Sequence, residues 1–246
     1  MKSILQPYIT PVDSGIHRIV ESQEKVATMQ LVDSLEEQTL LEELIEQTKP
    51  GLINGKRHYL IETPFRYPPL NHGSRFGSRF EPSIFYGSHS IDTMLYETAY
   101  YSFYFMSAMT APYENPIMNH KTAFEVNVKS HAYIDLSEID ESDWKEKLSS
   151  QNDYQFSQQV GAVLRDMDVK AFSYTSARDF QGKGKGKNMG VFGIDSLVGK
   201  PKGLTNWEIK QSQDNIVFYC QANTLLNKQI SIEEFLVDGI IPSPSR

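Results

Sequence analysis

The sequence predicts an α+β fold with a helical extension at its N-terminus. Three observations support this fold class. Residues 91–109 carry apolar side chains at helical spacing. Residues 123–128 alternate apolar and polar side chains, as a half-buried strand does. The helical and strand patterns also follow one another without strict alternation, which favours α+β over a doubly wound sheet.

Residues 1–51 are predicted to form the acidic helical extension, and residues 52–246 the main domain. Ser34 followed by Glu37 has capping-box spacing, which would divide a helical segment over 19–48 into two helices. Lys49-Pro50-Gly51 would end the second helix. The segment is either a solvated hairpin or an oligomer or partner surface. Its apolar residues at three- and four-residue steps are Ile19, Val20, Val26, Met29, Leu31, Val32, Leu35, Leu40, Leu41, Leu44 and Ile45.

The next segment, residues 57–89, is predicted to be loop and short strand because glycine and proline recur in it. Residues 83–86 resemble the end of a strand. Ser90 is a suitable N-cap for a helix over 91–109. The face of that helix expected in the core carries Met94, Leu95, Tyr100, Phe103 and Met106.

The remaining residues alternate between short strand and helix patterns. Strands are predicted at 123–128, 132–136, 169–174, 189–194, 204–210 and 216–221. Helices are predicted at 138–149, 153–166 and, as a short element, 231–237.

Composition narrows the function classes. The chain has 246 residues, of which 39% are hydrophobic and 22% charged, as in a soluble globular protein. It contains no apolar run long enough for a membrane span and no Cys/His cluster with zinc spacing. The single cysteine, Cys220, fits a reducing cytoplasm. The net charge of −7 argues against direct nucleic-acid binding.

The charge is unevenly distributed along the chain. Residues 20–48 carry eight acidic residues and one basic residue, which accounts for the whole net charge. The segment 54–90 is instead basic, and three of its arginines, Arg66, Arg75 and Arg79, lie among glycines, serines and aromatics. Arginine binds phosphate or carboxylate through paired hydrogen bonds, and glycine lets the backbone approach a ligand. The alternative is a basic loop that pairs with the acidic helices.

Two further places carry polar groups suited to a site. Glu97 lies in the middle of the predicted helix among aromatic residues, where it is either surface-facing or buried for a functional reason. Ser176, in Tyr174-Thr175-Ser176-Ala177-Arg178-Asp179, follows a predicted strand. No Gly-x-Ser-x-Gly elbow or adjacent histidine accompanies Ser176, so it is interpreted as a hydrogen-bonding group and not as a nucleophile.

Taken together, these residues resemble the RES domain family, which is named for its arginine, glutamate and serine. The resemblance covers residues 58–222. It departs from the family pattern at Phe80-Glu81, where many members have Trp-Asn or Trp-Ser, and in the Gly/Lys run 182–187, which lengthens a loop. The matching elements, in order, are Arg66 in Phe65-Arg66-Tyr67, Gly77-Ser78-Arg79-Phe80-Glu81-Pro82, Tyr86, Glu97, Tyr174-x-Ser176-x-Arg178-Asp179, and Asn188 before an apolar strand.

The resemblance implies an ADP-ribosyltransferase-like mixed sheet with flanking helices and an enzyme that breaks the nicotinamide–ribose bond of NAD. Arg66, Arg79, Glu97 and Ser176 would be catalytic. Glu97 would stabilise the positive charge on the sugar, and the two arginines would hold the diphosphate. No metal is implied. The residues expected to bind NAD are Arg66, Arg75, Arg79, Tyr86, Tyr174, Ser176, Arg178 and Asn188.

Three acceptors stay open: inorganic phosphate, water and a protein side chain. Phosphate is favoured, with Arg75, Arg178 or the lysines Lys183, Lys185 and Lys187 as its cations. The resemblance also implies a toxin with an Xre-type antitoxin as partner, a homo-oligomer in the complex and a cytoplasmic location. The non-enzymatic alternative is a ligand- or partner-binding module that has kept the fold.

Overall fold

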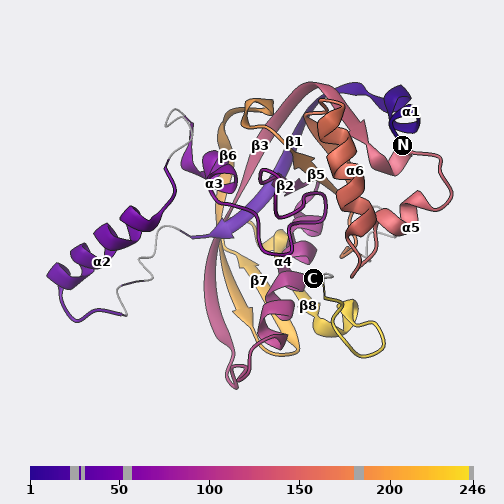
Figure 1. Cartoon of the computed structure of the whole chain (residues 1–246). Helices are drawn as coiled ribbons and strands as arrows, with labels where there is room; N and C mark the ends of the chain where they lie inside the picture. Colours follow the sequence, from indigo (N-terminus) through magenta and orange to yellow (C-terminus); the bar gives the residue numbers. More distant parts are fainter. Residues whose placement is uncertain (23–27, 29–30, 52–56, 180–185, 244–246) are drawn as a thin grey trace.

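The computed structural model describes residues 1–22, 28, 31–51, 57–179 and 186–243. It confirms the α+β class, because helices flank one large mixed sheet (Figure 1). The order of strands in this sheet is β1-β2-β5-β4-β3-β6-β7-β8. The strands are β1 (Thr10–Glu21), β2 (Phe85–Ser88), β3 (Ile117–Asp135), β4 (Ala171–Thr175), β5 (Lys187–Val191), β6 (Leu197–Gln211), β7 (Asn215–Cys220) and β8 (Lys228–Ser231).

The helices cover the faces and ends of this sheet. The α-helices are α1 (Lys2–Leu5), α2 (Leu35–Thr48), α3 (Tyr59–Arg66), α4 (Ile91–Ser107), α5 (Trp144–Leu148) and α6 (Gln155–Asp166). The 3-10 turns are η1 (Gln6–Tyr8), η3 (Leu136–Glu138), η4 (Ile194–Ser196), η5 (Thr224–Leu226) and η6 (Ile232–Phe235). None of the described helices is both long and apolar enough to cross a membrane.

The long strand β3 organises the sheet. Along one edge it pairs antiparallel with β1, from Thr10↔Tyr133 to Glu21↔Lys121. Along its other edge it pairs first with β6 and then, parallel, with β4. Because β1 also pairs with β2 at His17↔Ser88, the strands β1, β2, β5, β4 and β3 close into a ring. The predicted strands over 123–128 and 132–136 are therefore one continuous strand.

Strand β1 corrects the prediction for the N-terminal segment. Residues 19–21 are strand and not the beginning of a helix, and β1 belongs to the same sheet as the rest of the chain. Residues 1–51 are thus not helical throughout. The apolar residues Val26 and Met29 of the predicted helix lie outside the described residues.

Helix α2 confirms the second half of that prediction. Ser34 caps it by accepting a hydrogen bond from the backbone N–H of Glu37 at 3.1 Å, and Lys49 ends it. No residue of α2 is buried, and its leucines Leu35, Leu40 and Leu44 are at least half exposed. Figure 1 shows α2 projecting from the body of the molecule.

Most other predicted elements form, but some begin or end at other residues than predicted. Helix α4 begins after Ser90, whose hydroxyl accepts from the N–H of Thr93, and its five predicted core residues are buried. The helix predicted over 138–149 is shorter, and the one predicted over 231–237 is the 3-10 turn η6. Helix α3 and strand β8 were not predicted. Proline and glycine around α3 favoured loop, yet His58 caps this helix through the N–H of Leu60.

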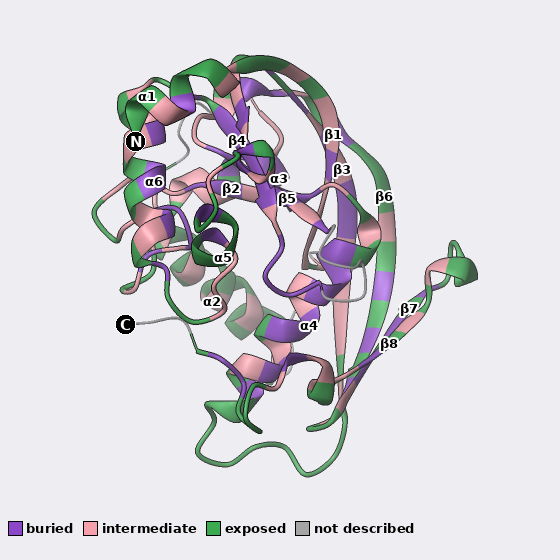
Figure 2. Cartoon of the chain, turned by 90° about the vertical axis from the view of Figure 1, so that its right-hand side faces the viewer, coloured by how far each residue is buried: buried purple, intermediate pink, exposed green. Residues whose placement is uncertain are grey.

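The core lies on both faces of the sheet. Helix α4 packs against β6, β7, β8 and η6, while α1, α5 and α6 pack near β4 and the loop containing Phe76. Figure 2 shows buried residues running along the sheet and on α4. The sheet ring and α4 together form the frame of the cavity described next.

Candidate active site

A cavity of about 610 Å³ lies between α4 and the sheet. Its walls come from β1, the loop 70–75, β2, α4 and the beginning of β3. Several segments far apart in the chain therefore contribute to one site. The lining residues that matter for chemistry are Arg18, Arg75, Tyr86, Ser88, Glu97, Tyr101, Tyr154, Tyr174 and Asn188.

Glu97 is the centre of a hydrogen-bond network at this cavity. Its Oε1 accepts from the Ser176 hydroxyl at 2.7 Å and from the Asn188 side-chain amide at 2.5 Å. Within the described part of the chain, Oε2 accepts no hydrogen bond, so this oxygen remains available to a ligand. The structure thus brings together three residues that the sequence predicted separately.

The partners of Glu97 are themselves held in place. The Ser176 hydroxyl accepts from the backbone N–H groups of Arg178 (3.1 Å) and Asp179 (3.0 Å), so its own proton is directed to Glu97. The amide oxygen of Asn188 accepts from the buried Ser88 hydroxyl at 2.7 Å, which leaves its NH₂ group for Glu97. Ser176 is buried and does not line the cavity, whereas Glu97, to which it donates, does. This arrangement supports a hydrogen-bonding role for Ser176.

Tyrosines form much of the remaining wall. The Tyr86 hydroxyl accepts from the backbone N–H of Phe76 (3.2 Å) and lies 2.9 Å from the Ser74 hydroxyl. Burial raises the pKa of Tyr86 to about 12. Burial, reinforced by the charge of Glu97, also raises the pKa of Tyr174. Both phenols therefore stay neutral and can act as hydrogen-bonding and stacking groups.

Arg75 and Arg178 mainly stabilise the protein around the cavity. Arg75 is buried, donates to the carbonyls of Leu148 (3.1 Å) and Ser150 (2.7 Å), and stacks on Tyr154 at 4.5 Å. Burial acts to lower the pKa of Arg75, but nearby tyrosines and Glu97 raise it overall, so the side chain remains charged. Arg178 donates to the carbonyl of Gln151 at 2.6 Å and does not line the cavity.

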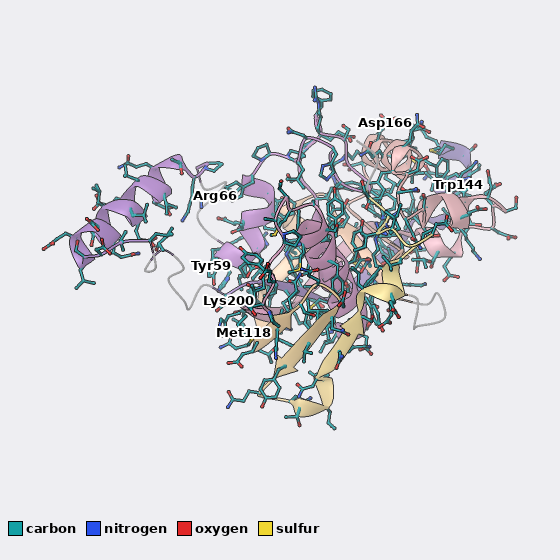
Figure 3. The ribbon with its side chains drawn as sticks, turned by 90° about the horizontal axis from the view of Figure 1, so that it is seen from below. Tyr59, Arg66, Met118, Trp144, Asp166 and Lys200 are labelled. Carbon is teal, nitrogen blue, oxygen red and sulfur yellow. The ribbon has the colours of Figure 1, made fainter. Side chains whose placement is uncertain are left out.

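Arg66 and Arg79 lie outside the cavity that contains Glu97. Arg66, which Figure 3 labels, lies at the end of α3. It donates to the carbonyl of Pro50 and lies 3.6 Å from Glu46 of α2. It lines a separate pocket of about 500 Å³. Arg79 is exposed and stacks on the ring of Phe80 at 4.5 Å. The geometry therefore does not bring these two predicted arginines to Glu97.

The predicted cations of the Gly/Lys run contribute little to the described site. Lys183 and Lys185 lie outside the described residues. Lys187 begins β5 and forms ion pairs with Asp135 at 2.8 Å and Glu138 at 3.1 Å. It is therefore already neutralised by two carboxylates.

Some lining residues were missed by the sequence analysis. Arg18 on β1, Tyr101 on α4 and Tyr154 before α6 all line the cavity. No local motif marks Arg18, because its place depends on the pairing of β1 with β2 and β3. Tyr101 could have been found from its spacing, since it is one helical turn after Glu97.

The lining of the cavity combines acidic, phenolic and basic side chains. Among the residues that the structure describes, no group of His, Cys, Asp or Glu side chains could hold a metal ion. The cavity offers a fixed carboxylate, neutral phenols and the guanidinium groups of Arg18 and Arg75.

A family of known proteins matches most of the chain. The RES domain family matches residues 50–209, which include Arg66, Arg79, Glu97, Ser176 and Asn188. No curated protein was found to be similar. Since the match covers more than half of the chain, the protein belongs to the RES domain family, whose members have NAD-related, toxin-like and generally enzymatic functions.

Proposed function

We propose that this protein cleaves the nicotinamide–ribose bond of NAD and transfers the ADP-ribose group to inorganic phosphate. The observation that carries the proposal is the fixed carboxylate of Glu97, held by Ser176 and Asn188 with its Oε2 unbonded by the described residues. This carboxylate lines a cavity with tyrosine walls. The cavity volume is in the range typical of small-molecule sites.

The chemistry needs negative charge beside the sugar. As the C–N bond breaks, its electron pair goes to the pyridinium nitrogen, which leaves as neutral nicotinamide. Positive charge then develops on the anomeric carbon and ring oxygen of the ribose. Glu97 would stabilise this charge electrostatically, and its two hydrogen bonds would fix it before the reaction begins, so little reorganisation is required.

The acceptor step is balanced without a general base. The hydrogen phosphate dianion would form the new C–O bond through an oxygen that already lacks a proton. The products would be nicotinamide and ADP-ribose 1″-phosphate. This choice of acceptor comes from the family resemblance, and the tests below discriminate it from water and protein acceptors.

Recognition of the dinucleotide would use the walls of the cavity. Tyr86 and Tyr174 would pack on the nicotinamide and ribose, since aromatic side chains stack on flat rings. Arg66 and Arg79 retain the diphosphate role that the resemblance implies. Because both lie outside the cavity here, this role requires movement of the segment 66–80 when the ligand binds.

The proposed biological setting is that of a cytoplasmic toxin with an Xre-type antitoxin as its partner. The support is family membership. The exposed acidic helix α2 is a suitable surface for the partner or for a homo-oligomer, because three of its leucines are at least half exposed.

The decisive experiment is NAD consumption by the purified full-length chain across a phosphate titration, with products resolved by mass. We expect ADP-ribose 1″-phosphate that increases with phosphate concentration. A rate independent of phosphate, with ADP-ribose as product, would identify a glycohydrolase. ADP-ribose attached to protein would identify a transferase, and unchanged NAD would favour a non-catalytic binding module.

A further inference from the structure

Arg18 is a cation of the cavity wall that lies outside the part of the chain matched by the family. It belongs to β1, whereas the RES domain match begins at residue 50. Pairing with β3 at Arg18↔Phe124 and the adjacent pair His17↔Ser88 place it beside β2. The guanidinium therefore contributes to the same cavity as Glu97.

The contacts of Arg18 leave its charge uncompensated. Nη1 donates to the carbonyl of Tyr86 at 2.5 Å, and the guanidinium lies over the ring of Phe85 at 4.8 Å. Nε is buried and has no hydrogen-bond partner among the described residues. In the same part of the chain, no carboxylate forms an ion pair with Arg18. Burial accordingly lowers its pKa to about 10, which still leaves it charged at neutral pH.

The other cations of the cavity wall are already engaged. Arg75 donates to two backbone carbonyls, and Lys121 forms an ion pair with Glu21. A partly buried guanidinium without an anionic partner is costly, and an anion bound beside it would remove much of this cost. Since arginine matches the geometry of phosphate oxygens, the natural anion is a phosphoryl group.

We propose that Arg18 binds a phosphoryl oxygen of the ligand in the Glu97 cavity. The identity of this ligand rests on the proposed function, under which the oxygen belongs either to the diphosphate of the dinucleotide or to the acceptor phosphate. Strand β1 would then complete the site from outside the family-matched region. The hydrogen bond from Arg18 to the Tyr86 carbonyl would also connect the bound anion to β2, which carries the Tyr86 and Ser88 side chains.

The test is direct binding of two probes, ADP-ribose and inorganic phosphate, to the full-length chain by calorimetry. Arg18→Met removes the charge and keeps an apolar stem over Phe85. Because one charge-assisted contact is lost, we expect roughly 10- to 100-fold weaker binding of the probe whose phosphoryl group Arg18 holds. Weaker binding of ADP-ribose would show that Arg18 holds the diphosphate. Weaker binding of inorganic phosphate would show that it holds the acceptor phosphate.

Arg165 provides a matched control. Like Arg18, it lies over a phenylalanine, Phe192 at 4.2 Å, and donates to one backbone carbonyl, that of Pro82 at 2.7 Å. Its Nε is likewise buried without a hydrogen-bond partner among the described residues, but Arg165 forms an ion pair with Glu81 at 3.8 Å and does not line the cavity. Arg165→Met should therefore leave the affinity for both probes unchanged.

The outcomes separate this inference from the proposed function. Equal affinities in wild type and Arg18→Met, or equal losses in the Arg18 and Arg165 variants, would overturn it even if NAD is consumed. A selective loss in Arg18→Met would support it even if NAD is not consumed. If Arg18→Met does not fold, Arg18→Lys keeps the charge without the paired donors, and weaker binding of one probe by this folded variant is expected. Unchanged affinity for both probes in Arg18→Lys would overturn the inference.

Discussion

Replacing Glu97 with glutamine removes the charge of the site while keeping its shape. The amide oxygen of the glutamine can accept both hydrogen bonds that Oε1 accepts now, from Ser176 and Asn188. Each bond changes from charge-assisted to neutral, from about 1.5–3 to about 0.5–1.5 kcal/mol. Two such changes reduce the free energy of unfolding by about 2–3 kcal/mol, a lowering of the melting temperature by about 4–12 °C.

The effect on catalysis should be much larger. A pre-positioned group that stabilises transition-state charge contributes about 2.7–4 kcal/mol, so kcat should decrease by roughly 10²- to 10³-fold. The assay is nicotinamide release from NAD, measured well below the melting temperature. Affinity for ADP-ribose should change far less than kcat, because the product carries no positive charge on the sugar.

Glu21→Gln is the control for this substitution. Glu21 also lines the cavity, but it pairs with Lys121 at the end of β1, and the described side-chain hydrogen bonds of Ser176 and Asn188 do not include it. Its substitution should leave kcat within a few-fold of wild type. Near wild-type turnover by a folded Glu97→Gln protein would refute the role of the carboxylate, and equal losses in both variants would show that the cavity responds only to its total charge.

Three further predictions test other parts of the molecule. Arg66→Ala and Arg79→Ala should each weaken NAD binding by roughly 1.5–3 kcal/mol, measured by calorimetry. Arg57→Ala should not, because Arg57 does not line the cavity and its side chain contacts Asp195 and the Leu197 carbonyl. Three equal results would contradict a specific diphosphate site. Burial lowers the pKa of His89, so the imidazole is protonated at a higher pH in the unfolded chain than in the folded one, and the free energy of unfolding should decrease as the pH falls below about 6.5. Chemical denaturation should show this loss in wild type and a smaller one in His89→Gln. Identical pH profiles for the two proteins would exclude His89 as the cause of the loss. Replacing residues 24–55 with a short Gly/Ser linker keeps β1. It should abolish self-association or antitoxin binding, measured by light scattering, without changing NAD affinity. Weakened NAD affinity in a folded protein would show that this segment contributes to the NAD site.

Local sequence signals were sufficient to predict the helices that have a regular apolar spacing or a recognisable N-cap. The capped helix α4 has an apolar face at helical spacing, and Ser90 marks its beginning. The same holds for the second half of the acidic segment, where Ser34 and Glu37 mark the beginning of α2. Glu97, Ser176 and Asn188 were recognised from the order of motifs, and their mutual hydrogen bonds give that order a physical basis.

The predictions failed where tertiary contacts decide the structure. Most residues of β1 are only partly buried, because it pairs on both edges and both faces are partly covered, so it shows no clear alternation. Helix α3 forms despite Pro64, and it places Arg66 against α2. The two arginines grouped with Glu97 by motif order were thus separated from it by the local conformation of the chain between residues 59 and 80.

The place of Arg18 illustrates why sequence patterns alone miss part of this site. In a strand, neighbouring side chains point to opposite faces, so a shift of β1 by one residue would exchange Arg18 with His17 or Ile19 at its present position. The register is set by eleven residue pairs with β3, about one hundred positions later in the chain. No local pattern around Arg18 encodes that pairing, and a family match beginning at residue 50 does not include it. The anion-binding potential of the cavity therefore becomes visible only when β1 is paired with β2 and β3.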